Sequence, residues 1–245
     1  MEAPSRGAGA GLGASARASS QPAQPTEHAG HWCWQGSAGS ARFLFCGKPT
    51  TGAESNVVGD LERSGLEIAT LHQIHSSLVV DARAGDCGEG DALVSSRCGL
   101  ALRVVTADCV PVLLAGETTI AAVHAGWRGL RDGIVATAVE RFGRDRPRSA
   151  LIGPAIGGCC YEVGADVAAE VAAGIGSTAV ILQRGEGLRP HLDLRLAALF
   201  ALREAGVEEV ATVDACTRCD ALRLSSYRRE GKGAGRNLAF VWRER

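Results

Sequence analysis

The sequence contains no apolar run approaching the roughly 18–20 residues that a membrane-spanning helix needs. Charge of either sign is not in excess: the formal net charge is −1, so no general attraction to nucleic acid or anionic membrane is indicated. The first residues lack the basic start and apolar block of a secretory signal. We therefore expect a cytoplasmic protein that binds neither nucleic acid nor membrane.

A disulfide framework is not predicted either, although the chain has nine cysteines. The chain is long, its cysteines are scattered, and their odd number leaves at least one thiol free. Cys159 and Cys160 are interpreted as buried thiols that pack as small hydrophobic side chains. Cys216 and Cys219 form a C-x-x-C, but no second pair follows at the spacing of a zinc site, so we predict no function for Cys219.

The composition divides the chain into a tail and one domain. Residues 1–30 are rich in Ala, Gly, Ser, Pro and Gln and offer little apolar surface to bury, which predicts a disordered tail. Residues 31–245 are expected to form a single domain, because this length suits one domain and 46% hydrophobic residues in the chain suffice for a core.

Hydrophobic periodicity predicts a mixture of strands and helices without a strict βαβ rhythm, hence one α/β (α+β) domain. Apolar or alternating runs predict strands at 67–71, 90–96, 99–107, 112–116, 119–124, 149–158, 177–183, 207–213 and 238–242. Helical spacing of apolar residues predicts helices at 130–142 and 165–173. A third helix is expected between Asp193 as N-cap and Gly206 as C-terminal stop.

Three candidate metal ligands, His75, Cys109 and His124, fall at the ends of predicted strands. One cysteine and two histidines would bind Zn²⁺ and leave a fourth position open, the usual arrangement of a catalytic zinc site. The spacing alone leaves an alternative open, in which both histidines are ordinary core or hydrogen-bonded side chains.

A series of short motifs resembles the YfiH-like family, whose members are called laccase-domain, polyphenol oxidase or purine nucleoside phosphorylase proteins. The motifs run in order from about residue 70 to the chain end: HQIHS, GDALVSS, TADCVPVLL, AAVHAGWRG, IGPAIGGCCYEVG, HLDLRLAAL, CTRCD and SYRREGKGAGR. The resemblance implies a single layered domain with a central β core flanked by helices, comparable to toxin-type cysteine deamidases, that is a monomer or weak oligomer.

The resemblance also implies what the domain does. The family's zinc ligands map to His75, Cys109 and His124, all present here. The implied reaction is phosphorolysis of adenosine, inosine, guanosine and methylthioadenosine, and the resemblance also allows adenosine deamination. A purine nucleoside and phosphate are therefore the expected partners.

Arginines are the expected phosphate ligands, because the planar guanidinium grips phosphate through two hydrogen bonds. Arg128, Arg228 and Arg236 lie in the family motifs, with Arg128 assigned to catalysis and the other two to phosphate binding. Asp108 is a candidate to orient a ligand or transfer a proton; the alternative is a turn carboxylate. Each arginine could instead form a surface ion pair.

Three other functions remain open. A copper polyphenol oxidase is disfavoured, because six histidines without any His-x-His pair are too few for a multicopper cluster. A cysteine hydrolase in peptidoglycan editing would use Cys109 as nucleophile and His124 as base. A non-enzymatic purine-binding module is the third, since the segment 42–60 lacks an arginine that the family usually carries there.

Overall fold

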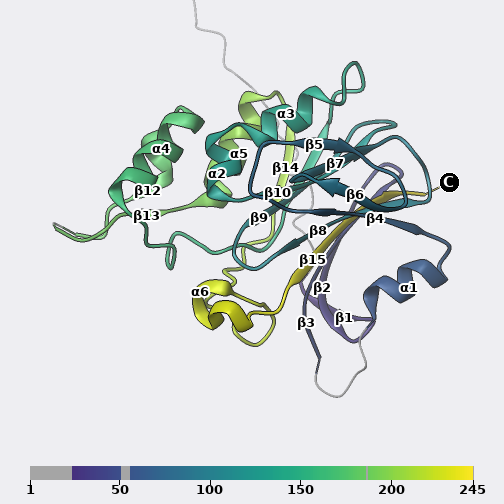
Figure 1. Ribbon diagram of the computed structural model, residues 1–245, viewed down its shortest axis with the longest axis horizontal. Coiled ribbons are helices and arrows are strands. Elements are labelled where there is room, and N and C mark those ends of the chain that lie inside the picture. The colour runs from purple at the N-terminus through teal and green to yellow at the C-terminus, as the bar shows by residue number, and fades with distance from the viewer. Residues whose placement is uncertain (1–23, 51–55, 186, 245) are drawn as a thin grey trace, which may run out of the picture.

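The computed structural model describes residues 24–50, 56–185 and 187–244. Two β-sheets pack face to face, and helices cover both outer faces (Figure 1). The larger sheet has the strand order β1-β2-β3-β15-β8-β4-β6, and the smaller sheet β14-β11-β9-β10-β7-β5. Strands β12 and β13 pair separately. The layered α/β class predicted from the sequence is confirmed.

The strands of the larger sheet are β1 Thr26–His28, β2 His31–Ala38, β3 Ala41–Pro49, β4 Glu67–His72, β6 Gly85–Glu89, β8 Leu100–Thr106 and β15 Asn237–Arg243. Those of the smaller sheet are β5 Val79–Asp81, β7 Ala92–Ser95, β9 Val110–Ala115, β10 Ile120–Ala125, β11 Ser149–Ile152 and β14 Glu209–Thr212. The separate pair comprises β12 Ile181–Leu182 and β13 His191–Leu192. The helices are α1 Val57–Arg63, α2 Trp127–Arg131, α3 Ile134–Glu140, α4 Ala165–Ile175, α5 Leu194–Glu204 and α6 Tyr227–Glu230, with 3₁₀ turns at Thr178–Val180 and Gly231–Gly233.

The central strands β9 and β10 are buried on both faces, which explains why their sequences are continuously apolar rather than alternating. On β9, Val112 and Leu114 pack toward the helices, whereas Leu113 and Ala115 pack between the two sheets. Successive side chains of a strand point to opposite faces, so one apolar strand contributes to two layers of the core.

Helices α2 to α5 gather on the outer face of the smaller sheet, and α1 lies on the outer face of the larger one (Figure 1). The predicted N-cap of α5 is confirmed: Asp193 accepts hydrogen bonds from the backbone N–H groups of Arg195 and Leu196. Helix α1 was not predicted; it is short, and Asn56 caps it by accepting from the N–H of Gly59.

Two predicted elements differ from the structure in type or continuity, and the strand expected over 149–158 is shorter, since β11 ends at Ile152. The single helix expected over 130–142 is two helices, because Gly133 adopts a left-handed conformation, φ 78°, and separates α2 from α3. The strand expected over 177–183 is a 3₁₀ turn, begun by the hydroxyl of Ser177, followed by the two-residue strand β12. In the segments 130–142 and 177–183 the apolar pattern continues across a point where the backbone conformation changes, so the pattern alone does not predict the change.

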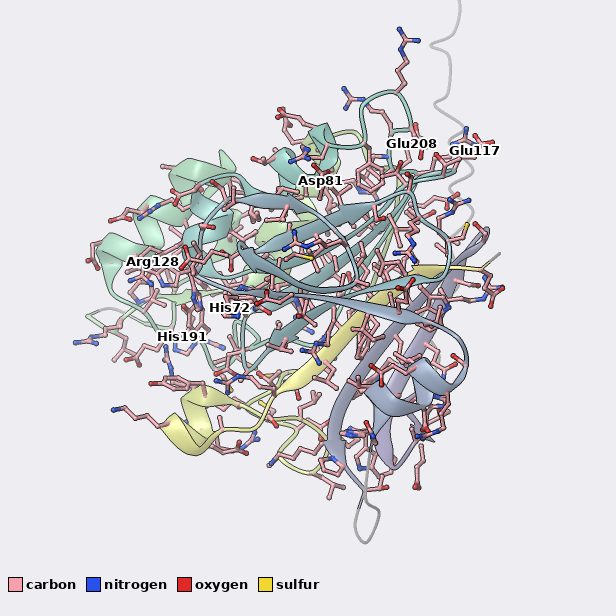
Figure 2. All side chains as sticks on the ribbon, turned by 45° about the vertical axis from the view of Figure 1, so that its right-hand side comes forward. His72, Asp81, Glu117, Arg128, His191 and Glu208 are labelled. Carbon is pink, nitrogen blue, oxygen red and sulfur yellow. A yellow bond between two sulfur atoms is a disulfide. The ribbon has the colours of Figure 1, made fainter. Side chains whose placement is uncertain are left out.

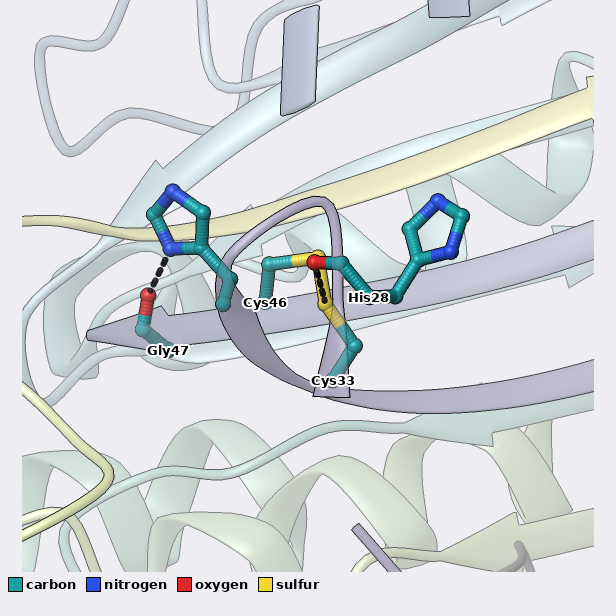
Figure 3. The surroundings of a disulfide bond; sticks show 5 residues. His28, Cys33, Cys46 and Gly47 are labelled. Carbon is teal, nitrogen blue, oxygen red and sulfur yellow. Dashed lines mark hydrogen bonds between the residues drawn. A yellow bond between two sulfur atoms is a disulfide. The ribbon is translucent and has the colours of Figure 1, made fainter. Parts of the chain in front are cut away.

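The N-terminal hairpin corrects two further expectations. Strand β1 lies inside the segment 1–30 that we expected to be disordered, and it pairs with β2, which follows that segment. Residues 1–23 lie outside the described residues. Cys33 and Cys46 lie opposite each other on β2 and β3 and form a disulfide, where no disulfide was predicted (Figure 3). Their pairing depends on strand register, which cysteine spacing does not reveal. Among the described residues, no helix is long and apolar enough to cross a membrane.

Candidate metal centre and pocket

The structure brings together the three candidate metal ligands from three separate chain segments. His75 follows β4, Cys109 stands between β8 and β9, and His124 lies on β10. Their ligand atoms all lie within 4.8 Å of one another. Cys109 Sγ is 3.9 Å from His75 Nε2, and the two imidazole rings meet edge to face at 4.9 Å between centroids. The group runs from the buried His124 to the exposed His75, so it opens toward solvent.

Asp91, which immediately precedes β7, supports this group from inside the fold through hydrogen bonds with His75 and His124. It is fully buried, and its carboxylate accepts hydrogen bonds from the backbone N–H groups of Ile74, His75 and Ser76 and from the Ser76 hydroxyl. These bonds hold His75 in the left-handed region, φ 59°, which a side chain other than glycine adopts at an energetic cost. Asp91 lies in the motif GDALVSS, where it was open whether the carboxylate belongs to the site or only to a turn, and these contacts place it directly beside the candidate ligands.

The same carboxylate fixes the orientation of His124, whose Nδ1 donates to Asp91 at 2.8 Å. A carboxylate is the usual outer partner of a metal-binding imidazole, and this bond leaves Nε2 of His124 facing a metal. Burial opposes the charge on both groups, but their hydrogen bonds prevail: the pKa of Asp91 is lowered to about 2 and the pKa of His124 is raised to about 9. Without a bound metal the pair therefore carries complementary charge, and a metal would take the place of the proton on Nε2 of His124.

Cys109 has the character of a thiolate. Burial would raise the pKa of its thiol, but contacts with His124 and His75 lower that pKa to about 6. A thiolate is the form that binds metals and the form that acts as a nucleophile. Two imidazoles and one thiolate within reach of a common point form a donor set suited to zinc, so the residues present fit the metal that the sequence predicts.

Gly126 provides the space that this group needs, and its replacement gives a first prediction. A Cβ there would lie 3.1 Å from His75 Cδ2 and 3.2 Å from Cys109 Sγ, closer than ordinary van der Waals contact. The φ of Gly126 is −76°, so an alanine would strain no backbone and would act only by crowding the ligands. We expect Gly126→Ala to weaken metal binding about tenfold, the lower end of the effect that changes in the residues around metal ligands have on metal affinity.

Metal competition with a chromogenic chelator measures this effect. Gly233→Ala is the matched control, because a Cβ at Gly233 meets no atom within 4 Å. Equal affinity of both variants for the metal would contradict the crowding argument.

Asp108 occupies the other strained position of the site, with φ 100°. Its Oδ1 accepts from the hydroxyl of Thr217 at 2.6 Å, and its Oδ2 accepts from the backbone N–H of Arg228 at 2.7 Å. The side chain is almost buried, so these bonds join two later segments of the chain to the loop that carries Cys109. Asp108 is thus an anchor of the site, and its role in proton transfer stays a prediction.

A pocket of about 630 Å³ opens over the group. Most of the predicted site residues line it: His75, Asp108, Cys109, His124, Arg228 and Arg236. Other lining residues that sequence reasoning missed are Gln73, Thr106, Tyr161 and Tyr227. All four belong to motifs that resemble the family, which could have marked them as candidates. Their residue types alone do not indicate that their side chains face the pocket.

The arginines of the site are placed differently from one another. Arg228 stacks over Tyr161, 5.1 Å from the ring centroid, and Arg236 donates to the backbone carbonyls of Ala234 and Gly235. Arg128, which was assigned to catalysis, is not among the residues that line the pocket; its guanidinium stacks at 4.4 Å over the ring of Trp127, which does line it. In Figure 2 the labels of Arg128, His72 and His191 lie in the same half of the view.

Thr106 adds a polar group without a partner to this pocket. Its hydroxyl is buried and has no hydrogen-bond partner among the described residues. Buried hydroxyls are normally hydrogen-bonded. A polar ligand in the pocket would supply the missing partner.

Comparison with known proteins places these features in context. Residues 54–244 match the family described as multi-copper polyphenol oxidoreductase laccase. The purine nucleoside phosphorylase of Deinococcus radiodurans is 42% identical over 183 residues, which cover 71% of this chain and 70% of that protein. The purine nucleoside phosphorylase YfiH of Escherichia coli is 38% identical over 179 residues, covering 70% and 72%. The crystal structure of Neisseria meningitidis protein NMB0706 superposes with a TM-score of 0.75 at 28% identity, covering 87% of this chain and 99% of that one.

Proposed function

This chain belongs to the multi-copper polyphenol oxidoreductase laccase family, and we propose that it is a zinc-dependent purine nucleoside phosphorylase. The observation that carries the proposal is one pocket that unites a metal-ligating group, His75, Cys109 and His124, with Arg228 and Arg236. Relatives at 38–42% identity named purine nucleoside phosphorylase support an enzyme of this kind. The proposed substrates are adenosine, inosine, guanosine or methylthioadenosine, together with phosphate.

The proposed reaction assigns separate tasks to the two halves of the pocket. A phosphate oxygen bonds to the anomeric carbon while the glycosidic bond breaks, and the purine leaves with the bonding electrons and takes up a proton. Arg228 and Arg236 hold the phosphate, because guanidinium groups bind phosphate oxygens in pairs. Tyr161, Trp127 and Leu71 supply ring and apolar surface suited to a purine.

His75, Cys109 and His124 would hold the zinc ion, which supplies a Lewis acid in the pocket when bound. We propose zinc rather than copper, because the two histidines and one cysteine are a complete catalytic zinc set, whereas six histidines in the chain are too few for a multicopper centre. Asp91 keeps His124 oriented, and the Thr106 hydroxyl is available to a substrate oxygen.

The deciding experiment incubates zinc-loaded protein with adenosine, with and without phosphate, and separates adenine, inosine and ribose-1-phosphate. Adenine and ribose-1-phosphate that appear only with phosphate are the expected products. Inosine formed regardless of phosphate would instead establish adenosine deamination, which the same metal group allows. No product from folded, zinc-loaded protein with any of the four nucleosides would refute the proposal.

Phosphate binding by Arg236 gives a second prediction. Its guanidinium contacts only neighbouring backbone carbonyls among the described residues and is free to turn toward a ligand. A charge-assisted hydrogen bond contributes about 1.5–3 kcal/mol, so Arg236→Ala should raise the KM for phosphate by at least about tenfold. The KM for the nucleoside should change much less.

Steady-state kinetics with each substrate varied in turn separates the two effects. Arg42→Ala is the control, because Arg42 forms an exposed ion pair with Glu244 outside the residues lining the pocket. A phosphate KM unchanged by Arg236→Ala would remove Arg236 from the phosphate site.

A second candidate function, a cysteine hydrolase, is favoured by one observation. Cys109, His124 and Asp91 form a continuous chain of contacts, with the thiol pKa lowered to about 6, as a nucleophile, a base and an orienting carboxylate would require. If Cys109 is a nucleophile, iodoacetamide should alkylate it stoichiometrically in metal-free protein, and the alkylated protein should no longer hydrolyse an amide derived from peptidoglycan. If Cys109 is a zinc ligand, bound zinc should protect it from iodoacetamide.

A further inference from the structure

A second group of metal-ligating side chains lies apart from the pocket, where β11 and β14 end. The sulfur atoms of Cys159, Cys160, Cys216 and Cys219 all lie within 4.8 Å of one another. Cys219 Sγ is 3.7 Å from that of Cys159 and 3.3 Å from that of Cys160. Sulfurs bound tetrahedrally to zinc, each at about 2.3 Å, are separated by about 3.8 Å. The four sulfurs therefore lie close enough together to be the ligands of one zinc ion.

The backbone explains why two distant pairs of cysteines meet. Strands β11 and β14 are parallel neighbours, so their carboxyl ends lie at the same edge of the smaller sheet. The pairing continues as a parallel bridge between Ala155 and Cys216, where the N–H of Thr217 donates to the Ala155 carbonyl. Each cysteine pair then sits in a tight turn, since Cys160 N–H donates to Gly157 and Asp220 N–H donates to Cys216. The cluster rests on a fixed scaffold.

Two donors reach the sulfurs and would stabilise thiolates, the form that binds metals. The N–H of Gly157 donates to Cys216 Sγ at 3.2 Å, and the guanidinium of Arg218 contacts Cys160. Four thiolates at this separation would repel one another, and a divalent cation at their centre would offset that repulsion.

We propose that Cys159, Cys160, Cys216 and Cys219 bind a structural zinc ion, separate from the His75–Cys109–His124 group. Four thiolates in a tetrahedral arrangement are the donor set of closed, structural zinc sites rather than of catalytic ones. The C-x-x-C at 216–219 therefore has its partner pair earlier in the chain, at 159–160. This site stands on its own ligands and does not depend on the function proposed for the pocket.

The position of this zinc site gives it a structural task. Tyr161 directly follows Cys160 and lines the pocket. Thr217 lies between the other two cysteines and donates to Asp108, which is adjacent to the metal ligand Cys109. One ion would therefore clamp together a segment that lines the pocket, through Tyr161, and a segment that anchors Asp108 through Thr217.

The experiment counts zinc ions per folded chain in protein purified with zinc under reducing conditions. We expect two ions in the native protein and one in Cys219→Ser and in Cys159→Ser; both positions are exposed, so these variants should fold, as circular dichroism can verify. Cys98→Ser, a free cysteine outside both groups, is the matched control and should retain two. Cys109→Ala should retain one ion, the one held by the cluster.

Cobalt substitution identifies the ligands. Cobalt-loaded Cys109→Ala should retain intense sulfur-to-metal charge-transfer absorption, and the double variant Cys109→Ala/Cys219→Ser should lose it. Chelation of zinc from Cys109→Ala should also lower its Tm.

Several results would overturn the proposal. One is that folded Cys109→Ala binds no zinc ion. Another is that Cys219→Ser leaves the zinc content unchanged. A third is a Cys160–Cys219 disulfide in protein purified with zinc and reductant. Because zinc is counted without any nucleoside, failure of this proposal is distinguishable from failure of the proposed phosphorylase activity.

Discussion

Cys109→Ala is expected to abolish metal binding by the His75–Cys109–His124 group and to lower nucleoside phosphorolysis by more than about 100-fold. Loss of an outer partner of a metal ligand already costs about 10–100-fold in affinity or activity, and Cys109 is itself a ligand atom of the group. The thiolate also supplies the negative charge among the three ligands, so two neutral imidazoles would remain. Metal content and phosphate-dependent release of adenine measure the two losses.

The comparison requires a folded variant and a matched cysteine. Cys98→Ala removes a thiol of similar exposure away from the pocket, and we expect it to keep native metal content at this group and native turnover. Far-ultraviolet circular dichroism and Tm establish folding of both variants. Native turnover by a folded Cys109→Ala protein would show that the reaction does not use this group.

Asp91→Asn is expected to lower both stability and metal affinity, because one carboxylate serves the fold and the ligands together. An amide presents one acceptor oxygen where three backbone N–H groups, the Ser76 hydroxyl and His124 now converge. Removing one partner of a buried charged pair costs about 3–5 kcal/mol in unfolding free energy. Loss of the His124 partner should weaken metal binding by about 10–100-fold. Urea denaturation and metal titration measure these effects separately.

Asp145→Asn is a close structural control for this variant. Asp145 also accepts hydrogen bonds from three successive backbone N–H groups, at 117–119, but it lies in a turn away from the metal group. We expect Asp145→Asn to lower stability while leaving metal affinity unchanged. If Asp91→Asn likewise kept native metal affinity, Asp91 would be a turn anchor with no influence on the ligands.

The elements that could be predicted most clearly from the sequence are those in which nearly every residue is buried. Strands β9 and β10 are buried on both faces, so their apolar runs are unambiguous. Cys109 and His124 became candidate metal ligands because each stands at the end of such a run, and His75 joined them because it follows another predicted strand and the motifs around all three resemble a known family. The N-cap of α5 was predicted from Asp193, whose short polar side chain has a local partner.

Features that depend on pairing between distant segments could not be predicted in this way. The four-cysteine cluster arises from the parallel register of β11 and β14, and no spacing within either pair reveals the other. The Cys33–Cys46 disulfide depends on antiparallel register in the same manner. The contacts of Asp91 also depend on distant segments, because the groups it binds come from the loop at 74–76 and from β10.

The place of β15 has a consequence for how the protein is made. This strand contains residues 237–243 yet lies inside the larger sheet, between β3 and β8. While the chain emerges from the ribosome, the inner edges of β3 and β8 have no partner until residues 237–243 have been synthesised. All three candidate metal ligands are translated before this strand, and Arg236 immediately precedes it. Nascent chains therefore present His75, Cys109 and His124 well before the side of the pocket that contains Arg236 can close around them.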